Sequence, residues 1–247
     1  MITPAAVIPV YNHGRAISAV VEHVLAAGLP CILVNDGSEA ETTAHLNRLA
    51  NAHREHITLL TNVRNVGKGG SVLRGLGKAD ELGFSHALQI DADGQHDASR
   101  IPEFLSIARA NPAAVIAGMP VFDASIPRGR LYPRYLTHVL VWIETLSFEI
   151  RDSMCGFRVY PIAPVLAIAR RVALGLRMDF DIEILVRLHW EGLPLVSVPT
   201  PVRYPADGVS HFRLWRDNVL ITRLHVMLLF GMLSRLPQLA GRRWRAS

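Results

Sequence analysis

The chain has 247 residues, a length typical of one α/β domain and sufficient for a sizeable hydrophobic core. Hydrophobic residues make up 50% and charged residues 19%, which argues against an intrinsically disordered protein. The net charge of +5 suits anionic partners such as phosphorylated substrates, acidic lipid surfaces or nucleic acid. The basic residues are scattered and are not interleaved with aromatic ones, so we expect no binding to nucleic acid.

The first half of the chain alternates between strand-type and helical patterns. Strand-type apolar runs occur at 5–10, 31–35, 57–61, 87–90 and 113–117. Helical patterns occur between them, near 16–27, 41–52, 71–82 and 100–110. This alternation predicts an α/β fold with a mostly parallel central sheet that helices cover on both faces. In such sheets, ligands bind beyond the carboxyl ends of the strands.

The second half of the chain is less regular. We expect helices near 135–150, 162–170, from the acidic segment 178–183 to about 191, and at 214–235, with a strand at 195–198. One stripe of the helix at 135–150 carries Leu136, Val139, Leu140, Ile143 and Ile150. We predict a catalytic domain over 1–213, followed over 214–247 by an amphipathic and then apolar helix with a basic tail.

The C-terminal helix suits a membrane surface. Its uncharged stretch is well short of the roughly 20 residues that span a bilayer, and Trp244 and several arginines follow it. An apolar helix followed by tryptophan and arginines suits the inner face of an anionic membrane. The alternative is that this helix packs on the core of the protein. The N-terminus shows no secretory signal, and Cys31 and Cys155 form no CxxC pair. We therefore expect a cytoplasmic protein, peripheral to the inner face of the membrane.

Polar or glycine-containing turns follow four consecutive predicted strands. They are Pro9-Val10-Tyr11-Asn12-His13, Asn35-Asp36-Gly37-Ser38, Asn65-Val66-Gly67-Lys68-Gly69-Gly70 and Asp91-Ala92-Asp93-Gly94-Gln95. Because the carboxyl ends of parallel strands share one edge of a sheet, these turns together outline a site.

The pair of Asp91 and Asp93 is the strongest of these signals. Two carboxylates at the end of a buried strand are placed to face one hard cation, and Mg²⁺ or Mn²⁺ held in this way completes its shell with substrate phosphate oxygens. Lys68 and the backbone N–H groups that open the next helix suit a phosphate. Asp36 suits hydrogen bonds from a ribose or a base. The alternative for each motif is an ordinary solvated turn.

As a set and in this order, the four motifs resemble those of family 2 glycosyltransferases of the GT-A fold, and the resemblance covers nearly the whole chain. Later segments look most like the polyprenyl-phosphate sugar transferases, a group that includes dolichyl-phosphate mannose synthase. These segments are Cys155-Gly156-Phe157-Arg158, Phe180-Asp181-Ile182-Glu183, and Arg203 followed by Gly208-Val209-Ser210. The resemblance implies a GT-A-like nucleotide-diphospho-sugar transferase fold.

The resemblance also implies roles for single residues. The nucleoside of a UDP- or GDP-linked donor would contact Pro9, Tyr11, Asn12 and Asp36. The metal and the diphosphate would be bound by Asp91, Asp93 and Gln95. The phosphate side of the acceptor region would be lined by Arg158, Arg203, Ser210, His211 and Arg213.

The chemistry of transfer follows from charge. The leaving diphosphate gains negative charge, which a divalent ion on Asp91 and Asp93 neutralises, and attack from the opposite face inverts the anomeric centre. A hydroxyl acceptor needs a general base, for which Asp179 and Asp181 are equal candidates. The alternative is that these acids only complement the dipole at the N-terminus of the helix that follows. A lipid phosphate needs no base because it is already largely ionised at neutral pH, and arginines would position it.

We expect polyprenyl phosphate to be the acceptor. Two alternatives stay open, namely transfer to a hydroxyl of another lipid or glycan, and a catalytically silent nucleotide-binding scaffold on the same fold. The sequence leaves the base and the sugar of the donor undetermined.

Overall fold

The structure is a computed structural model of residues 1–247, and it describes the chain except for residues 15, 123–127, 203–213 and 247, and except for the side chains of 128–132, 214 and 242–246. Its described strands form one sheet in the order β3-β2-β1-β4-β6-β5-β7. They are β1 (Pro4–Val10), β2 (Cys31–Asn35), β3 (Ile57–Thr61), β4 (His86–Gln89), β5 (Val115–Phe122), β6 (Arg158–Pro161) and β7 (Leu195–Val202). The short β6 runs antiparallel to β4 and β5, and the other neighbouring strands pair in parallel. The predicted mostly parallel sheet is therefore confirmed.

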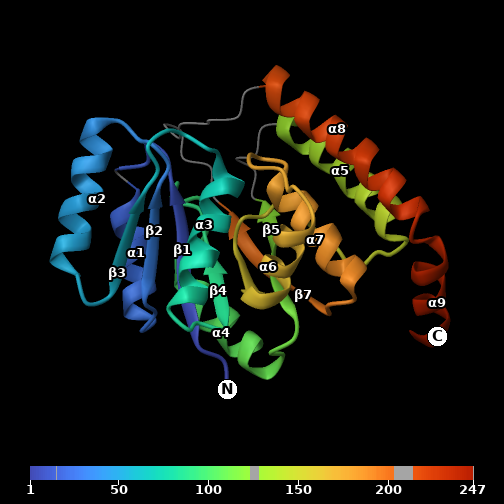
Figure 1. Cartoon of the computed structure of the whole chain (residues 1–247), viewed down its shortest axis with the longest axis horizontal. Coiled ribbons are helices and arrows are strands. Elements are labelled where there is room, and N and C mark those ends of the chain that lie inside the picture. Colours follow the sequence, from blue (N-terminus) through green and yellow to red (C-terminus); the bar gives the residue numbers. More distant parts are fainter. Residues whose placement is uncertain (15, 123–127, 203–213, 247) are drawn as a thin grey trace.

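Helices cover both faces of the sheet (Figure 1). The described helices are α1 (Ile17–Ala26), α2 (Ala40–Ala52), α3 (Lys68–Glu81), a 3₁₀ turn (Ala98–Arg100), α4 (Ile101–Ala110), α5 (Arg128–Thr145), α6 (Ile162–Arg171), α7 (Phe180–Glu191), α8 (Leu214–Leu233) and α9 (Leu236–Ala246). One core cluster joins α1, α2 and α4 to the sheet, and the other joins α3, α6, α7 and α8 to its opposite face.

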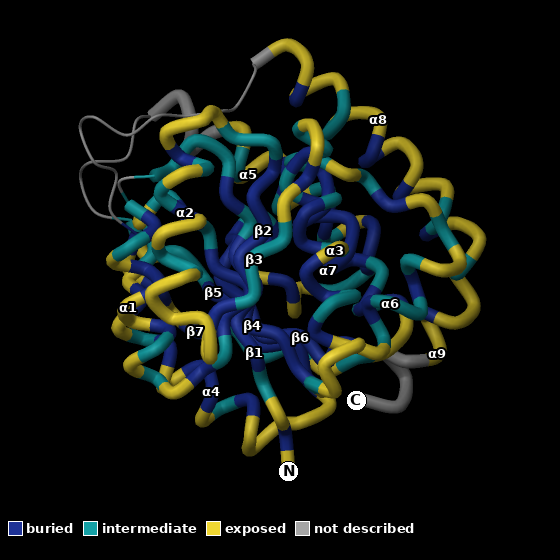
Figure 2. Tube along the Cα trace, turned by 60° about the vertical axis from the view of Figure 1, so that its left-hand side comes forward, coloured by how far each residue is buried: buried dark blue, intermediate teal, exposed yellow. Residues whose placement is uncertain are grey.

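Each parallel strand contributes to both cores. In β1, Ala6 and Ile8 belong to one cluster, whereas Ala5 and Val7 belong to the other, because successive side chains of a strand point to opposite faces. Figure 2 shows the strands as buried segments at the centre of the molecule. Gly75 lets α3 lie close to the sheet, since an added Cβ there would overlap the side chain of Val7. These contacts hold the start of α3 at the edge of the sheet.

Helix α7 is buried nearly all round. Apolar residues on every side of the helix pack into the second core, as is typical of an internal helix. The helix ends at Gly192, whose φ of 87° provides the left-handed backbone that favours glycine after a helix. Its first turn lies beside the Asp91 turn, as Lys68 bonds to both segments, whereas its last turn packs against α9 through Gln238 and Trp190.

The second half differs from the sequence prediction in α5, β6 and the C-terminal helices, and β7 continues to Val202 instead of ending at residue 198. Helix α5 ends at Thr145, and the stripe with Leu136, Val139 and Ile143 faces outward because Val141 and Glu144 occupy the buried side. Strand β6 was not predicted, since it has only four residues and ends in proline. Helix α8 ends at Leu233, and α9 replaces the expected tail because Pro237 lacks the N–H needed to continue α8 but fits the first turn of a new helix.

Helices α5 and α8 lie side by side as an outer layer (Figure 1). The buried side of α8 packs on the core through Leu224, Leu228 and Met232. His225 Nδ1 lies 2.8 Å from Glu144 Oε1, so a hydrogen bond joins the two helices in the interior. Within the described part of the chain, no helix combines the length and apolarity that a membrane crossing requires.

Candidate functional site

The turns after β1, β2, β3 and β4 meet at one edge of the sheet because these four strands run in parallel. Strand β6 is antiparallel, so its beginning, not its end, lies at the same edge, and Arg158 pairs with Gln89. The antiparallel strand thus brings the loop before it, with Gly156, next to the Asp91 turn. The structure brings the predicted turns together with a segment from the second half of the chain.

The turns after β1 and β2 are tied to each other. Asn12 has a left-handed backbone with φ of 56°, and its N–H donates to Ser38 Oγ at 3.1 Å. The Asn12 side chain accepts from the Glu39 N–H at 2.9 Å. Pro9 and Tyr11 are half-buried beside this connection. Hydrogen bonds thus join the turn with Pro9, Tyr11 and Asn12 to the turn after β2, which contains Asp36.

Asp36 holds the loop that leads into α3. Its carboxylate accepts hydrogen bonds from the N–H groups of Val66 at 2.8 Å and Gly67 at 2.9 Å, and from Asn62 Nδ2 at 2.8 Å. The residue is only 2% exposed. Asp36 thus positions the backbone in front of Lys68, and its contact with a nucleoside stays a prediction.

Lys68 lies between two carboxylates at the centre of the site. Its Nζ is 2.6 Å from Asp91 Oδ1 and 2.7 Å from Asp181 Oδ2. Burial alone would lower the pKa of Lys68, but Asp181 and Asp91 outweigh it and raise that pKa above its usual range. Burial likewise tends to raise the pKa of Asp91, but Lys68 and then His96 hold it well below its usual range. The ammonium and the Asp91 carboxylate are therefore both charged at neutral pH.

The second oxygen of Asp91 faces the loop before β6. His96 Nε2 lies 3.7 Å from Asp91 Oδ2, and the His96 ring packs against Phe157. An added Cβ at Gly156 would overlap this carboxylate and lie 2.5 Å from Lys68 Nζ. Glycine is thus required at 156 by space alone, because the Asp91 and Lys68 side chains fill the position that a larger residue would take.

Asp93 and Gln95 complete the turn. The Gln95 N–H donates to Asp93 Oδ1 at 3.0 Å, so the turn folds back on the carboxylate. The sequence reasoning placed Asp91 and Asp93 on an extended chain, but β4 ends at Gln89 and both residues lie in the segment that follows, with Asp93 in a turn. The described residues contain no cluster of three or more His, Cys, Asp or Glu residues placed to hold a metal.

The donor set nevertheless fits Mg²⁺ or Mn²⁺. Carboxylate and amide oxygens from Asp91, Asp93 and Gln95 are hard ligands, and Mg²⁺ is usually held by one or two carboxylates with substrate phosphates. Asp91 is kept ionised, as a metal ligand must be. The Lys68 ammonium against Asp91 shows that this corner already accommodates positive charge.

The structure separates the two candidate bases. Asp181 belongs to the Lys68 cluster, and its second oxygen accepts from Gln89 Nε2 at 2.9 Å. Asp179 instead directly precedes α7, and its side chain accepts a hydrogen bond from the Arg177 N–H at 3.0 Å. Only Asp181 is therefore linked, through Lys68, to the Asp91 turn.

Arg158 is fully buried at the start of β6. Its NH1 donates to the Asp181 carbonyl at 2.7 Å and to the Tyr160 hydroxyl at 3.0 Å, and its NH2 donates to the Ser153 carbonyl at 2.7 Å. The guanidinium joins β6, the loop before it and the start of α7, so as placed it positions these segments. The contact of Arg158 with an acceptor phosphate stays a prediction.

The other expected acceptor residues lie outside the described part of the chain. They are Arg203, Ser210, His211 and Arg213.

Three residues of the site were missed by the sequence reasoning. Gln89 is the one polar residue inside the otherwise apolar run at 87–90, and that signal was available. His96 directly follows the Asp91–Gln95 motif, but the sequence analysis gave it no role. Gly156 belongs to a segment that carried the resemblance, but its role comes from packing against Asp91, which the sequence does not show.

Solved structures of similar fold include glucosyl-3-phosphoglycerate synthase from Mycobacterium tuberculosis in complex with Mn²⁺ and UDP-glucose. Its TM-score is 0.67 at 14% identity, with 94% of this chain and 79% of that chain covered. S. aureus TarS 1–349 in complex with UDP gives a TM-score of 0.62 at 13% identity, with 94% and 71% covered. This likeness shows the fold and confirms the expected GT-A-like architecture.

Curated relatives were found by sequence. An uncharacterized protein of Methanocaldococcus jannaschii is 26% identical over 212 residues, 83% of this chain and 90% of that protein. Dolichyl-phosphate beta-glucosyltransferase of Dictyostelium discoideum is 28% identical over 186 residues, 68% of this chain and 53% of the enzyme. Polyprenol monophosphomannose synthase of Mycolicibacterium smegmatis is 25% identical over 217 residues, with 83% and 78% covered. The chain spans about half the length of the Dictyostelium enzyme.

A family model described as glycosyl transferase family 2 matches residues 5–175. The matched span contains all four turns at the sheet edge, the Lys68–Asp91 pair and the Gly156 loop. With most of the chain matched, the chain belongs to glycosyl transferase family 2.

Proposed function

We propose that the chain is an inverting, metal-dependent glycosyltransferase that moves a sugar from a UDP- or GDP-linked donor to polyprenyl phosphate at a membrane surface. The observation that carries this proposal is the position of Lys68 between Asp91 and Asp181, beside the Asp91-Ala92-Asp93 turn. A site for a sugar diphosphate needs ionised carboxylates for the metal and a fixed cation for the phosphates, and this cluster contains both.

The metal would be held by Asp91, Asp93 and Gln95. When bound, it would act as a Lewis acid that neutralises charge on the departing diphosphate. Lys68, at the first position of α3, would add its ammonium and the N–H groups of that helix end to the same phosphates. Gly156 leaves space for the Asp91 carboxylate, and Asp181 holds Lys68. The resting cluster thus pre-orients the groups that face the diphosphate.

The arrangement of Asp181 favours a phosphate acceptor over a hydroxyl. Both of its carboxylate oxygens are already engaged, one by Gln89 and the other by Lys68. Asp179 is turned to the loop before α7. A phosphate monoester carries its charge at neutral pH and attacks without a general base. The names of the relatives agree with this choice, since two of them are transferases of dolichyl phosphate and polyprenol phosphate.

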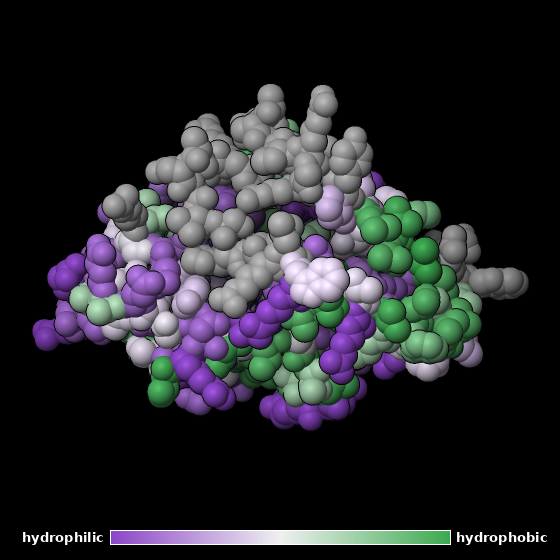
Figure 3. All heavy atoms as spheres, turned by 90° about the horizontal axis from the view of Figure 1, so that it is seen from above, coloured by the Kyte–Doolittle hydropathy of each residue, from purple (hydrophilic) through white to green (hydrophobic). Residues whose placement is uncertain are grey.

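The outer layer of α5 and α8 supports contact with a membrane. Figure 3 shows hydrophobic side chains gathered at the end of the molecule where α5 and α8 lie. Exposed apolar residues of these helices are Tyr135, Leu136, Val139, Ile143, Trp215, Val219, Val226, Met227, Leu229, Phe230 and Leu233. Exposed apolar surface on this scale is typical of a protein or membrane contact, and the net positive charge suits an anionic inner face.

The test is a transfer assay with the full chain. UDP- and GDP-linked sugars are supplied with Mn²⁺ and either polyprenyl phosphate or polyprenol, and the anomeric configuration of the product is read by NMR. Asp91→Asn and Asp93→Asn should each lower kcat/KM by roughly 10²–10³-fold, as expected for losing a group that stabilises developing charge. Asp80→Asn, an exposed change at the end of α3, is the matched control and should leave the rate unchanged.

Each outcome decides between the alternatives. Transfer to polyprenyl phosphate alone supports the proposal, whereas transfer to polyprenol replaces it with the hydroxyl reaction. Binding of a sugar nucleotide without transfer to either acceptor would identify a silent scaffold. Retained activity in both aspartate variants would overturn the metal site.

A further inference from the structure

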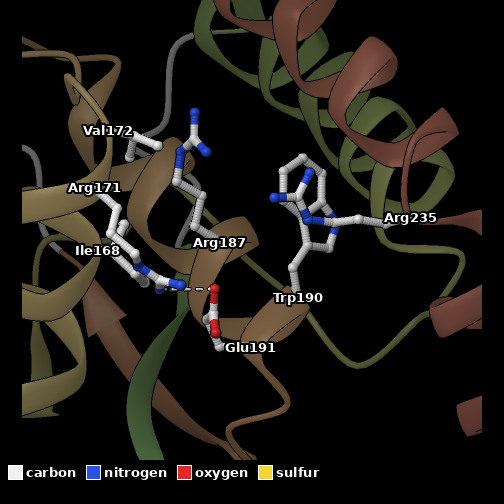
Figure 4. Close-up of a pocket in the computed structure, with 7 residues that line it drawn as sticks. All are labelled: Ile168, Arg171, Val172, Arg187, Trp190, Glu191 and Arg235. Atoms are coloured by element: carbon white, nitrogen blue, oxygen red, sulfur yellow. Dashed lines mark hydrogen bonds and ion pairs between the residues drawn. The ribbon is translucent and has the colours of Figure 1, made fainter.

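A second concave site lies away from the Asp91 turn, where α6, α7 and the junction of α8 and α9 meet. It has a volume of about 180 Å³, and we call it the arginine pocket after Arg171, Arg187 and Arg235, which line it together with Trp190 and Glu191. Figure 4 shows the three guanidinium groups around the pocket, with Arg235 lying across the Trp190 ring. Arg187 and Trp190 belong to the second half of α7, whereas Asp181 is near its start. None of the residues that line the pocket belongs to the candidate transferase site.

The protein holds the three guanidinium groups in place. Arg187 Nε donates to Glu183 Oε1 at 2.7 Å, and Arg171 NH2 donates to Glu191 Oε1 at 2.9 Å. Arg235 lies 4.7 Å from the centre of the Trp190 ring, a distance typical of a cation–π contact. The Trp190 ring is itself fixed, because its Nε1 donates to the Glu144 carbonyl at 2.9 Å.

These contacts leave the arginine pocket with a net positive charge and with guanidinium N–H donors that have no partner. Arg171 pairs with Glu191 and Arg187 with Glu183, so with Arg235 included the group carries a formal charge of +1. Each guanidinium has five N–H donors. Among the residues that the structure describes, NH1 of Arg171, NH1 of Arg187 and NH2 of Arg235 have no hydrogen-bond partner. Three arginines from separate helical segments, each with a spare donor, therefore line one cavity.

We propose that the arginine pocket binds the phosphate group of an anionic ligand. A tetrahedral phosphate offers acceptor oxygens in several directions, so it suits N–H forks that approach from α6, α7 and the α8–α9 junction. The cavity exceeds the volume of about 30 Å³ that one water molecule occupies in the liquid.

The ligand has two sources with the same chemistry, a free phosphate ester and the headgroup of an anionic phospholipid. The pocket lies beside the exposed face of α8, as Arg187 NH2 is 4.0 Å from Met227 Sδ and Phe230 and Leu233 are exposed nearby in the sequence. A headgroup in the pocket would leave its acyl chains next to apolar side chains. The experiment therefore includes an arm for each source.

The test measures binding and needs no transferase activity, so its failure is distinguishable from failure of the proposed function. Binding of inorganic phosphate is measured by calorimetry, and binding to vesicles by sedimentation, with phosphatidylcholine alone or mixed with phosphatidic acid. Arg171→Gln and Arg235→Gln should each weaken binding about tenfold. Arg170→Gln, an exposed neighbour on α6 outside the pocket, is the matched control and should change it less than twofold.

Arg171 is exposed and its side-chain ion pair is with Glu191, so the Arg171→Gln variant is expected to fold, and its thermal unfolding is recorded. Arg171→Lys keeps the positive charge but removes the forked N–H donors of the guanidinium. Its affinity for phosphate or vesicles should lie between that of the wild type and that of Arg171→Gln. Binding in the phosphate arm or in the phosphatidic acid arm that depends on Arg171 and Arg235 supports the proposal and identifies the source. Equal losses in Arg170→Gln, or no binding in either arm, would overturn it.

Discussion

Gly156→Ala tests whether the position of the Asp91 carboxylate matters for activity at the candidate transferase site. The added Cβ would lie 2.6 Å from Asp91 Cγ and 2.5 Å from Lys68 Nζ, whereas carbon atoms in contact are about 3.5–4.0 Å apart. Lys68 has a flexible end, but Asp91 has a short side chain and must retreat by about 1 Å. A misplacement of that size costs about 10²-fold in rate, which corresponds to roughly 2.7 kcal/mol of transition-state stabilisation.

The assay compares kcat/KM for transfer and the affinity for Mn²⁺, measured by electron paramagnetic resonance. Gly77→Ala is the matched control because it lies inside α3, close in sequence to Lys68, and an added Cβ there meets no atom within 4 Å. It should leave kcat/KM and Mn²⁺ affinity unchanged and raise the stability by roughly 0.5–1 kcal/mol, since alanine is the better helix former. Wild-type activity and Mn²⁺ affinity in Gly156→Ala would refute the role assigned to Asp91.

Three further predictions concern buried charge and buried thiols. Lys68→Met leaves the carboxylates of Asp91 and Asp181 without their shared cation, so it should lower the free energy of unfolding, measured in urea, by about 3–5 kcal/mol. Mn²⁺ should raise the melting temperature of this variant more than that of the wild type. Equal shifts in the two proteins would contradict the idea that Mn²⁺ and the Lys68 ammonium share one position beside Asp91. Burial tends to raise the pKa of Asp152, but His138 and Arg134 outweigh it and hold that pKa well below its usual range. Because the folded pKa lies below the unfolded value of about 3.9, the stabilisation is present above that value and is lost as the pH falls through the folded pKa. The stability difference between wild type and Asp152→Asn should therefore be largest near pH 7 and shrink below about pH 4, and a difference independent of pH would refute this reasoning. Both cysteines, Cys31 and Cys155, are buried, and burial raises the pKa of the Cys155 thiol to about 12. A disulfide reagent at pH 8 should therefore titrate neither thiol in the folded protein and both in urea. Fast reaction of the folded protein would show that Cys155 is accessible.

The sequence predicted the first half of the fold well because its signals are local. Strands β2 and β3 were predicted with the observed bounds, since each is an apolar run between polar turns. The turns with Asp36, Lys68 and Asp91 follow parallel strands, so their meeting at one edge is a consequence of topology alone.

The second half depends on contacts that are distant in sequence. Strand β6 begins with Arg158 and ends with Pro161, so it shows no continuous apolar run, and it forms because it pairs with β4 and β5. The stripe of α5 has the spacing of a buried face, yet Leu136 and Ile143 are exposed because α8 packs against the side with Val141 and Glu144. Periodicity shows that a helix has an apolar face, but it does not show what covers that face.

For the candidate site, the sequence by itself determined the Asp91-Ala92-Asp93 turn, the lysine that opens α3 and the family to which they belong. Only the tertiary structure decided that Lys68 lies between Asp91 and Asp181. The reason is that Asp181 reaches the sheet edge through the packing of α7 and the hydrogen bonds of its neighbours Arg158 and Gln89, which come from other strands. Residue types are read from local patterns, whereas the pairing of charges is set by the shape of the assembled core.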